Sequence, residues 1–377
     1  MKSFSLGAQD ICLKELNNIM TKTNNPQEIL KLIKILSPQT LPKLEYISRE
    51  DLSLTNVREG GIKEDALITP EMRYPKPSSY PLGAENAHGE IEMIGDVPAT
   101  HWYVEADGIT WHFVTAGNPS NEAFVLVHGF PESWYTFHNQ VRDLSDQFYC
   151  IAVDTLGNGQ SDKRLALDYR YSAIAESLRK LLDTIGIERF NLGGHDRGSV
   201  ISDHLLNVDG MEGRVLRYIR MQQSANEPHG DPQPPHKIFA QPWFPRLMKW
   251  TGFPRLSYAA SGYRVKGITK EVLDRLDHEV KFKGVAEASP RQFAHTNLQK
   301  ELDDRHNFLF AKMSMPVLFL QGKHDPGQHP EEYENTPDFV ANGKVQFIDG
   351  NHFFQLGDSA EEATAAMRAF LSEPLNA

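Results

Sequence analysis

The chain has 377 residues, of which 40% are hydrophobic and 24% charged, and its net charge is −11. This composition is typical of a globular protein, and the acidic balance does not favour binding to nucleic acid or to an anionic membrane. The two cysteines are too few for a disulfide framework or a CxxC metal site. No run approaches the roughly 20 apolar residues of a membrane span, and no signal peptide is evident in MKSFSLGAQD. We therefore expect a cytoplasmic protein without a membrane span.

Residues 1–95 differ from the rest of the chain. Apolar residues recur at helical spacing in ICLKELNNIM and QEILKLIKIL, which predicts one or two amphipathic helices. A polar, proline-rich passage follows, ITPEMRYPKPSSYPLGAENAHGE, and it predicts a linker or an extended arm. An extension of this kind serves either as a partner or dimerisation module, which could make the protein a homodimer, or as an arm that wraps the core or braces the cap.

Strands and helices are expected to alternate from residue 96 to residue 224. THWYVEADGITWHFVTAG alternates apolar and polar residues around an Asp-Gly turn and predicts a hairpin. FVLVHG, FYCIAVD, FNLGGHD and VLRYIRM are short apolar runs typical of buried parallel strands, and YSAIAESLRKLLDTIG predicts an amphipathic helix. PVLFLQG and KVQFIDG extend the series within residues 306–377. The alternation predicts an α/β protein with a doubly wound, mostly parallel sheet.

The alternation fails between residues 225 and 305. This stretch is rich in proline, aromatic and basic residues and contains none of the short apolar runs of its neighbours. We interpret it as a helical cap inserted after the sixth core strand. The expected organisation is thus an N-terminal extension (1–95), a core in two parts (96–224 and 306–377) and a cap (225–305).

The segment FNLGGHDRGS, residues 190–199, carries the strongest chemical signal. A strand enters Gly194-His195-Asp196-Arg197-Gly198 and a helix follows. This is the small-x-nucleophile-x-small pattern of a nucleophile elbow, with Asp196 at the nucleophile's place. Small residues are needed on either side because a larger side chain would collide with the neighbouring strand or helix. The turn would lift the carboxylate of Asp196 above the sheet.

Three further motifs support this assignment. LVHGFPESWY, residues 126–135, turns sharply after a strand, so that the N–H groups of Phe130 and Arg197 can form an oxyanion hole. Asp325 follows the strand PVLFLQG, and His352 follows the strand KVQFIDG. We therefore predict a triad of nucleophile, acid and histidine, in that chain order, formed by Asp196, Asp325 and His352.

HGFPESWY, the Asp-type elbow GHDRGS and the late NHF resemble the epoxide hydrolase and dehalogenase branch of the α/β-hydrolase superfamily. The resemblance covers about residues 98–377 and leaves out the N-terminal extension. It implies an α/β-hydrolase fold with an inserted helical cap. It also implies hydrolysis of a small-molecule substrate without a metal or organic cofactor.

An aspartate nucleophile suits displacement at a saturated carbon, because it is already ionised at neutral pH. Attack on an epoxide or a carbon–halogen bond would give an alkyl ester of Asp196. His352, held by Asp325, would then activate the water that hydrolyses the ester. HGFPESWY is most similar to the epoxide hydrolases, so conversion of an epoxide to a vicinal diol is the expected reaction.

Epoxide hydrolases of this type use two cap tyrosines to protonate the epoxide oxygen. This sequence departs from that pattern. His236 is the polar candidate in HKIFAQP and His295 the candidate in RQFAHTN, whereas Tyr258 and Tyr263 lie in the cap at other spacings. We expect these four residues, together with Trp134, to contact the substrate.

Two alternatives remain open from the sequence. A haloacid or haloalkane dehalogenase would use the same nucleophile; fluoroacetate-type dehalogenases share an Asp-Arg pair such as Asp196-Arg197 but have a second arginine where this chain has Val200. A hydrolase fold can also persist as a catalytically inactive binding module. Loss of catalysis usually removes a member of the triad, and all three members are present here.

Overall fold

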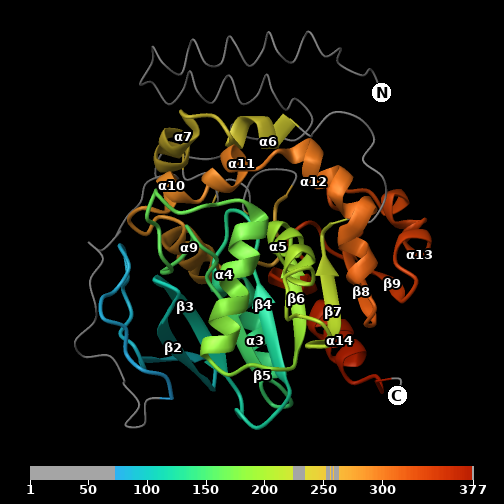
Figure 1. Cartoon of the computed structure of the whole chain (residues 1–377), viewed down its shortest axis with the longest axis horizontal. Coiled ribbons are helices and arrows are strands. Elements are labelled where there is room, and N and C mark those ends of the chain that lie inside the picture. Colours follow the sequence, from blue (N-terminus) through green and yellow to red (C-terminus); the bar gives the residue numbers. More distant parts are fainter. Residues whose placement is uncertain (1–72, 224–233, 252–254, 256–257, 259–262, 376–377) are drawn as a thin grey trace.

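The structure is a computed structural model that describes residues 73–223, 234–251, 255, 258 and 263–375. The helices predicted between residues 11 and 36 lie outside this range. A central sheet carries helices on both faces, and further helices lie over one end of it (Figure 1). Among the described residues, no helix is both long enough and apolar enough to cross a membrane.

The sheet has nine strands in the order β1-β2-β3-β5-β4-β6-β7-β8-β9. Strands β1, β2 and β3 form an antiparallel meander, β3 pairs with β5 in the antiparallel sense, and all later pairs are parallel. The strands are β1 (Ile91–Ile94), β2 (Val97–Ala106), β3 (Ile109–Ala116), β4 (Ala123–Val127), β5 (Tyr149–Val153), β6 (Phe190–His195), β7 (Val215–Met221), β8 (Val317–Gly322) and β9 (Gly343–Ile348).

The predicted hairpin is confirmed in β2 and β3. Its turn is Asp107-Gly108, and both residues have positive φ, at 51° and 71°. Asp-Gly tolerates this conformation well and matches the twist of the two strands. The predicted parallel strands are confirmed as β4 to β9, and each residue of β4 and β5 is buried because helices cover both faces of the sheet.

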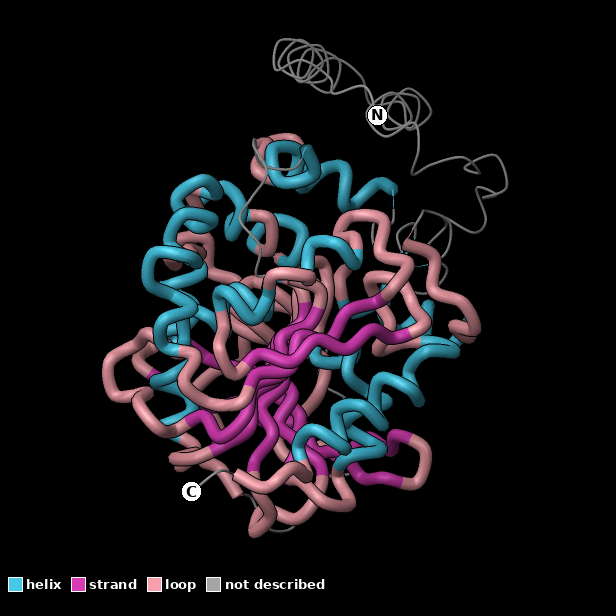
Figure 2. The backbone as a smooth tube through the Cα atoms, turned by 90° about the vertical axis from the view of Figure 1, so that its right-hand side faces the viewer, coloured by secondary structure: helices cyan, strands magenta, loops and turns pink. Residues whose placement is uncertain are grey.

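Two layers of helices cover the sheet (Figure 2). On one face α4 (Tyr171–Thr184) packs beside α5 (Arg197–Leu205), and on the other α3 (His138–Leu144) packs beside α14 (Ala360–Leu371). The period of apolar residues in α4 explains its placement, since Ile174, Leu178 and Leu181 are all buried. Short helical turns complete the core: η2 (Trp134–Phe137), η4 (Phe310–Lys312), η5 (Pro330–Tyr333), α13 (Thr336–Phe339) and η6 (Gly357–Ser359).

The stretch between β7 and β8 is helical where the structure describes it. Its elements are α6 (Pro234–Phe239), α7 (Phe244–Thr251), α9 (Lys270–Glu279), α10 (Val285–Ala288), α11 (Arg291–His295), α12 (Leu298–Asp304) and η3, a π-helix (Arg305–Leu309). Figure 1 shows α6, α7 and α11 above the sheet, at the end where the parallel strands finish. Phe244 and Phe293 of this cap pack against Phe130 of the core, which joins the two parts through an apolar cluster.

One predicted boundary needs correction. We expected the core to begin at residue 96, but β1 pairs with β2 from Ile91 to Ile94, so that boundary lies inside the first hairpin. As a result, the cap follows the seventh strand of the sheet and not the sixth. Sequence periodicity gave no sign of β1, because IEMI is only four residues long and follows a polar stretch.

Residues 73–95 form an arm that lies on both core and cap. Tyr74 is buried and packs edge-on against Trp102 at 5.2 Å between ring centroids. The arm also contacts helix α9 of the cap through a hydrogen bond between Glu85 and His278 at 2.7 Å and an ion pair between Glu92 and Arg275 at 3.1 Å. The part of the predicted linker that the structure describes is therefore an ordered brace.

Candidate active site

Asp196 occupies the tight turn between β6 and α5. Its backbone has φ 49° and ψ −118°, a strained conformation for a residue with a side chain. Two hydrogen bonds hold the turn: the Asp196 N–H donates to the Met221 carbonyl at 3.1 Å, and the Ser199 N–H donates to the Asp196 carbonyl at 3.0 Å. The turn therefore fixes the direction of the Asp196 side chain.

Two glycines leave room for this turn. A Cβ at Gly198 would lie 2.0 Å from the carbonyl oxygen of Val127, so any side chain there would push α5 away from β4. A Cβ at Gly129 would lie 2.6 Å from the Cβ of Asp196. The small residues of the two motifs are thus explained by close approach of backbone and side chain.

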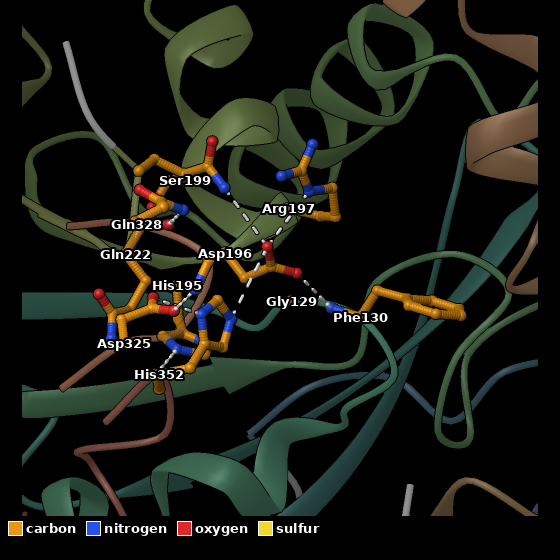
Figure 3. A network of polar contacts seen from close by, with 12 residues as sticks. Gly129, Phe130, His195, Asp196, Arg197, Ser199, Gln222, Asp325, Gln328 and His352 are labelled. Atoms are coloured by element: carbon orange, nitrogen blue, oxygen red, sulfur yellow. Dashed lines mark hydrogen bonds and ion pairs between the residues drawn. The ribbon is translucent and has the colours of Figure 1, made fainter. Parts of the chain in front are cut away.

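Both carboxylate oxygens of Asp196 have donors (Figure 3). Oδ2 accepts from the backbone N–H of Phe130 at 3.0 Å, and Oδ1 accepts from Nε of Arg197 at 3.2 Å. Nε2 of His352 lies 3.9 Å from Oδ1. Burial alone would raise the pKa of Asp196, but the charges of Arg197 and His352 hold it well below its usual range. The carboxylate is therefore ionised at neutral pH.

His352 is oriented by Asp325. Its Nδ1 lies 2.8 Å from Oδ2 of Asp325, whose other oxygen accepts the Gly327 N–H at 2.7 Å. Burial favours the neutral imidazole, but the charge and hydrogen bond of Asp325, together with the charge of Asp196, raise the pKa of His352 to about 9. The ring is therefore protonated at neutral pH while Asp196 is ionised.

The structure thus brings together the three predicted triad residues and the N–H of Phe130. Each follows a parallel strand: β4 for Phe130, β6 for Asp196, β8 for Asp325 and β9 for His352. The part of the predicted oxyanion hole formed by the Arg197 N–H stays a prediction. In the described ranges, no group of three or more His, Cys, Asp or Glu side chains is placed to hold a metal ion.

His195 lies behind the turn. Its Nδ1 lies 2.8 Å from Oε2 of the buried Glu132, and its Nε2 lies 2.9 Å from the backbone carbonyl of His352. Glu132 also accepts the Gly129 N–H at 2.7 Å. The His195–Glu132 pair therefore links the elbow, the H-G-F-P turn and the loop of His352.

The cap tyrosines lie on the side of His352. The ring of Tyr263 is 5.5 Å from that of His352 and nearly perpendicular to it. Burial, followed by the charges of Asp325 and Asp196, raises the pKa of Tyr263 above its usual range. Tyr258 is fully buried, and its ring packs 4.6 Å from Phe353. Tyr263 is thus the predicted cap residue with a ring against the triad.

The other three predicted substrate contacts have different surroundings. His295 accepts the Tyr169 N–H at 3.3 Å, at the junction of α11 with the start of α4. His236, in α6, has its ring 5.7 Å from that of Phe293. Trp134 is fully buried in the core, and its backbone N–H donates to Asp154. Their contact with substrate stays a prediction.

Sequence reasoning missed one residue that contacts the nucleophile and a second that contacts the first. Gln223, two residues past β7, donates from Nε2 to Oδ1 of Asp196 at 3.3 Å. Arg305, at the start of η3, donates to Oε1 of Gln223 at 3.1 Å. A polar residue just past a parallel strand is a usable signal for Gln223, but nothing in the sequence near Arg305 indicates its position.

Comparisons with known proteins agree with this architecture. A family described as alpha/beta hydrolase fold matches residues 122–359. Epoxide hydrolase 4 of Mus musculus is 33% identical over 106 residues, 27% of this chain and 30% of that protein. The soluble epoxide hydrolase of Corynebacterium sp. (strain C12) is 35% identical over 103 residues, 27% of this chain and 35% of that protein. The alignments therefore span about a third of these relatives.

Solved structures are similar over a longer range. The epoxide hydrolase CorEH without ligand has a TM-score of 0.60 at 22% identity, covering 72% of this chain and 99% of that one. A Bacillus megaterium epoxide hydrolase in complex with an inhibitor has a TM-score of 0.62 at 18% identity, covering 72% of this chain and 100% of that one. The family match spans more than half of the chain and includes the elbow, the acid and the histidine. The chain belongs to the α/β-hydrolase fold family.

Proposed function

We propose that the chain is an epoxide hydrolase in which Asp196 is the nucleophile. The observation that carries this proposal is the position of its carboxylate at the elbow, between the N–H of Phe130 and the ring of His352. The sequence relatives named epoxide hydrolases support the choice of leaving group.

In the first step, Oδ1 of Asp196 attacks a ring carbon of the epoxide. The carbon–oxygen bond of the ring breaks, and its electron pair moves to the ring oxygen. The product is an alkyl ester of Asp196. The carboxylate needs no base for this step, because Arg197 and His352 keep it ionised.

Tyr263 is the candidate for the acid that protonates the ring oxygen. Its ring lies against His352, and its raised pKa means that its hydroxyl keeps its proton at neutral pH. A hydroxyl that transfers this proton as the ring opens would avoid a free alkoxide. The proton returns to Tyr263 when the ester is hydrolysed.

In the second step, His352 takes a proton from water, and the resulting hydroxide attacks the carboxyl carbon of Asp196. The bond between the carboxyl carbon and the ester oxygen breaks, and the leaving oxygen takes the proton from His352, which releases the vicinal diol. One water oxygen remains in the Asp196 carboxyl group, whose proton passes to Tyr263. Ester formation removes the negative charge of Asp196, one of the charges that raise the pKa of His352. The pKa of His352 therefore falls when the ester forms, at the stage when the ring must act as a base.

A dehalogenase is the second candidate, and the contact between Arg197 and Asp196 favours it. A guanidinium beside the attacking oxygen could hold an acid whose halogen leaves. The attack and the hydrolysis would be the same, but halide leaves without a proton, so Tyr263 would have no role as acid.

The test is the intact mass of His352→Gln after exposure to panels of epoxides and halogenated acids. This variant should form the ester and fail to hydrolyse it. His324→Gln, which removes an exposed histidine, is the matched control and should turn over without accumulating an adduct.

Gain of a whole epoxide mass, mapped to Asp196 and absent from Asp196→Asn/His352→Gln, is the result expected. Gain of a haloacid mass less hydrogen halide would make the enzyme a dehalogenase instead. A wild-type enzyme that hydrolyses an epoxide while His352→Gln gives no adduct on Asp196 would contradict the covalent mechanism.

A further inference from the structure

A group of arginines lies beside Asp196 where the cap returns to the core. Arg197 follows the nucleophile, Arg220 lies in β7, and Arg305 begins the π-helix η3. All three are buried, at 7%, 0% and 7% exposure. Buried guanidinium groups are costly unless each is paired with an anion.

Two of the nearby carboxylates are already paired. Asp203 receives a two-pronged contact from Arg220, with Nη2 to Oδ2 at 2.8 Å and Nε to Oδ1 at 3.0 Å. Glu301, in α12, lies 2.5 Å from Nε2 of His204. Among the described residues, Asp196 is the carboxylate that Arg197 contacts, whereas the charges of Asp203 and Glu301 act on Arg305 while their oxygens contact Arg220 and His204.

Arg305 has no carboxylate of its own in the described part of the chain. Its Nη2 donates to the neutral amide of Gln223 at 3.1 Å, and its Nε is buried without a hydrogen-bond partner among those residues. Burial, followed by the charges of Arg220 and Arg197, lowers the pKa of Arg305 to about 10. The guanidinium therefore stays charged at neutral pH although its surroundings disfavour the charge.

Gln223 connects Arg305 to the reacting oxygen. The same amide that accepts from Arg305 donates to Oδ1 of Asp196, which also accepts from Arg197. Arg197 thus donates to Oδ1 of Asp196 directly, and Arg305 is connected to the same oxygen through the side chain of Gln223. When that oxygen becomes part of an ester, its charge disappears, and Arg197 loses the anion that it contacts directly.

We propose that Arg197 and Arg305 form an anion subsite beside Asp196 that binds a carboxylate on the substrate. The enzyme then acts on acids that carry the reactive carbon close to their carboxylate. Such a group replaces the charge that Asp196 loses and supplies an acceptor for the unpaired Nε of Arg305. This inference rests on the proposed function, since it names the substrate class of the same site.

The test uses two small epoxides that differ in charge, oxirane-2-carboxylate and oxirane-2-carboxamide. Covalent labelling rates at low concentration are measured by intact mass in His352→Gln, alone and with Arg305→Met, Arg305→Lys or Arg246→Met. Arg246 is an exposed cap residue, so its loss removes the same charge from the surface. The decisive quantity is the ratio of acid to amide labelling, because the two epoxides differ in intrinsic reactivity.

Arg305→Met should lower this ratio about ten- to hundredfold, the loss expected for one charge-assisted hydrogen bond. Labelling by the amide should change less than about threefold, which also shows that the variant is folded. Arg305→Lys should retain part of the preference, and Arg246→Met all of it. An unchanged ratio in Arg305→Met, or an equal fall in Arg246→Met, would overturn the subsite.

Failure of both epoxides to label Asp196 would contradict the epoxide reaction and not the subsite. The subsite is then judged by binding, without turnover. Propionate should raise the melting temperature of Asp196→Asn more than propionamide does, and Arg305→Met in that background should abolish the difference. Equal shifts for the two ligands would overturn the inference, including the case in which an acidic residue of the chain itself already fills the subsite.

Discussion

The sheet and the cap contribute to the candidate site in different ways. Asp196, Asp325 and His352 each follow a parallel strand, and hydrogen bonds or ion contacts link them. On the cap side, Tyr263 lies against His352, whereas His295 contacts the start of α4. Strand ends are placed by the pairing of the backbone, but cap residues are placed by side-chain packing. Topology therefore places the residues of the proposed attack, and side-chain packing places the cap residues proposed to contact the substrate.

The largest effect should come from the sheet side. Asp196→Asn keeps the size of the side chain and removes the ionised oxygen, so turnover should fall at least about 10⁴-fold. Steady-state rates on any substrate of the wild type would check this. Retention of a tenth of the activity would mean that water attacks the substrate directly.

Asp325→Asn should have the next largest effect, about 10³- to 10⁴-fold on turnover, because His352 loses its orienting partner. It should also change the pH dependence. Asp325 raises the pKa of His352, so its loss lowers that pKa. Hydrolysis of the ester needs the neutral ring of His352. The rise of the hydrolysis rate with pH should therefore occur at lower pH in this variant. Single-turnover rates between pH 5 and 10 would show the shift. If the rate rises at the same pH as in the wild type, a group other than His352 controls the pH dependence.

Tyr263→Phe addresses the cap side. If Tyr263 protonates the leaving oxygen, its loss should slow epoxide opening about 100-fold. Tyr258→Phe is the matched control, since Tyr258 packs on Phe353 and should change the rate less than about threefold. Rates of ester formation in the His352→Gln background isolate this step. If both variants slow ester formation equally, Tyr263 is not the acid that protonates the leaving oxygen.

The smallest effect should come from His295→Gln. Its ring accepts the N–H of Tyr169 and lies 4.0 Å from Asp168, so it joins α11 to the core. We expect less than about a threefold change in kcat/KM, together with a lower melting temperature. A large fall in kcat at an unchanged melting temperature would instead indicate that His295 contacts the substrate.

Sequence patterns predicted the sheet half of the site because its signals are local. A short apolar run, a tight turn and a polar residue occur together at the elbow and again near Asp325 and His352. The chain order of these motifs then fixes which strand ends meet. The same reasoning placed the hairpin at Asp107-Gly108.

The cap half lacks comparable signals. Tyr263 and His295 are single residues in helical or irregular segments, and their neighbours depend on how those segments pack. Arg305 is a clearer case, because its partner Gln223 lies 82 positions earlier in the chain. Strand β1 escaped prediction for a related reason: four residues form a strand there only because β2 lies beside them.

The arm of residues 73–95 has a consequence for dividing the chain into pieces. It fills part of the core with Tyr74 and is joined to α9 of the cap by Glu85 and Glu92. A recombinant fragment cut at residue 96, where composition changes, would lose both the edge strand and the tether of the cap. A fragment that retains both must start before Glu85, and one that also keeps the core contact of Tyr74 must start before that residue, so the arm belongs with the core and the cap in any truncation or domain exchange.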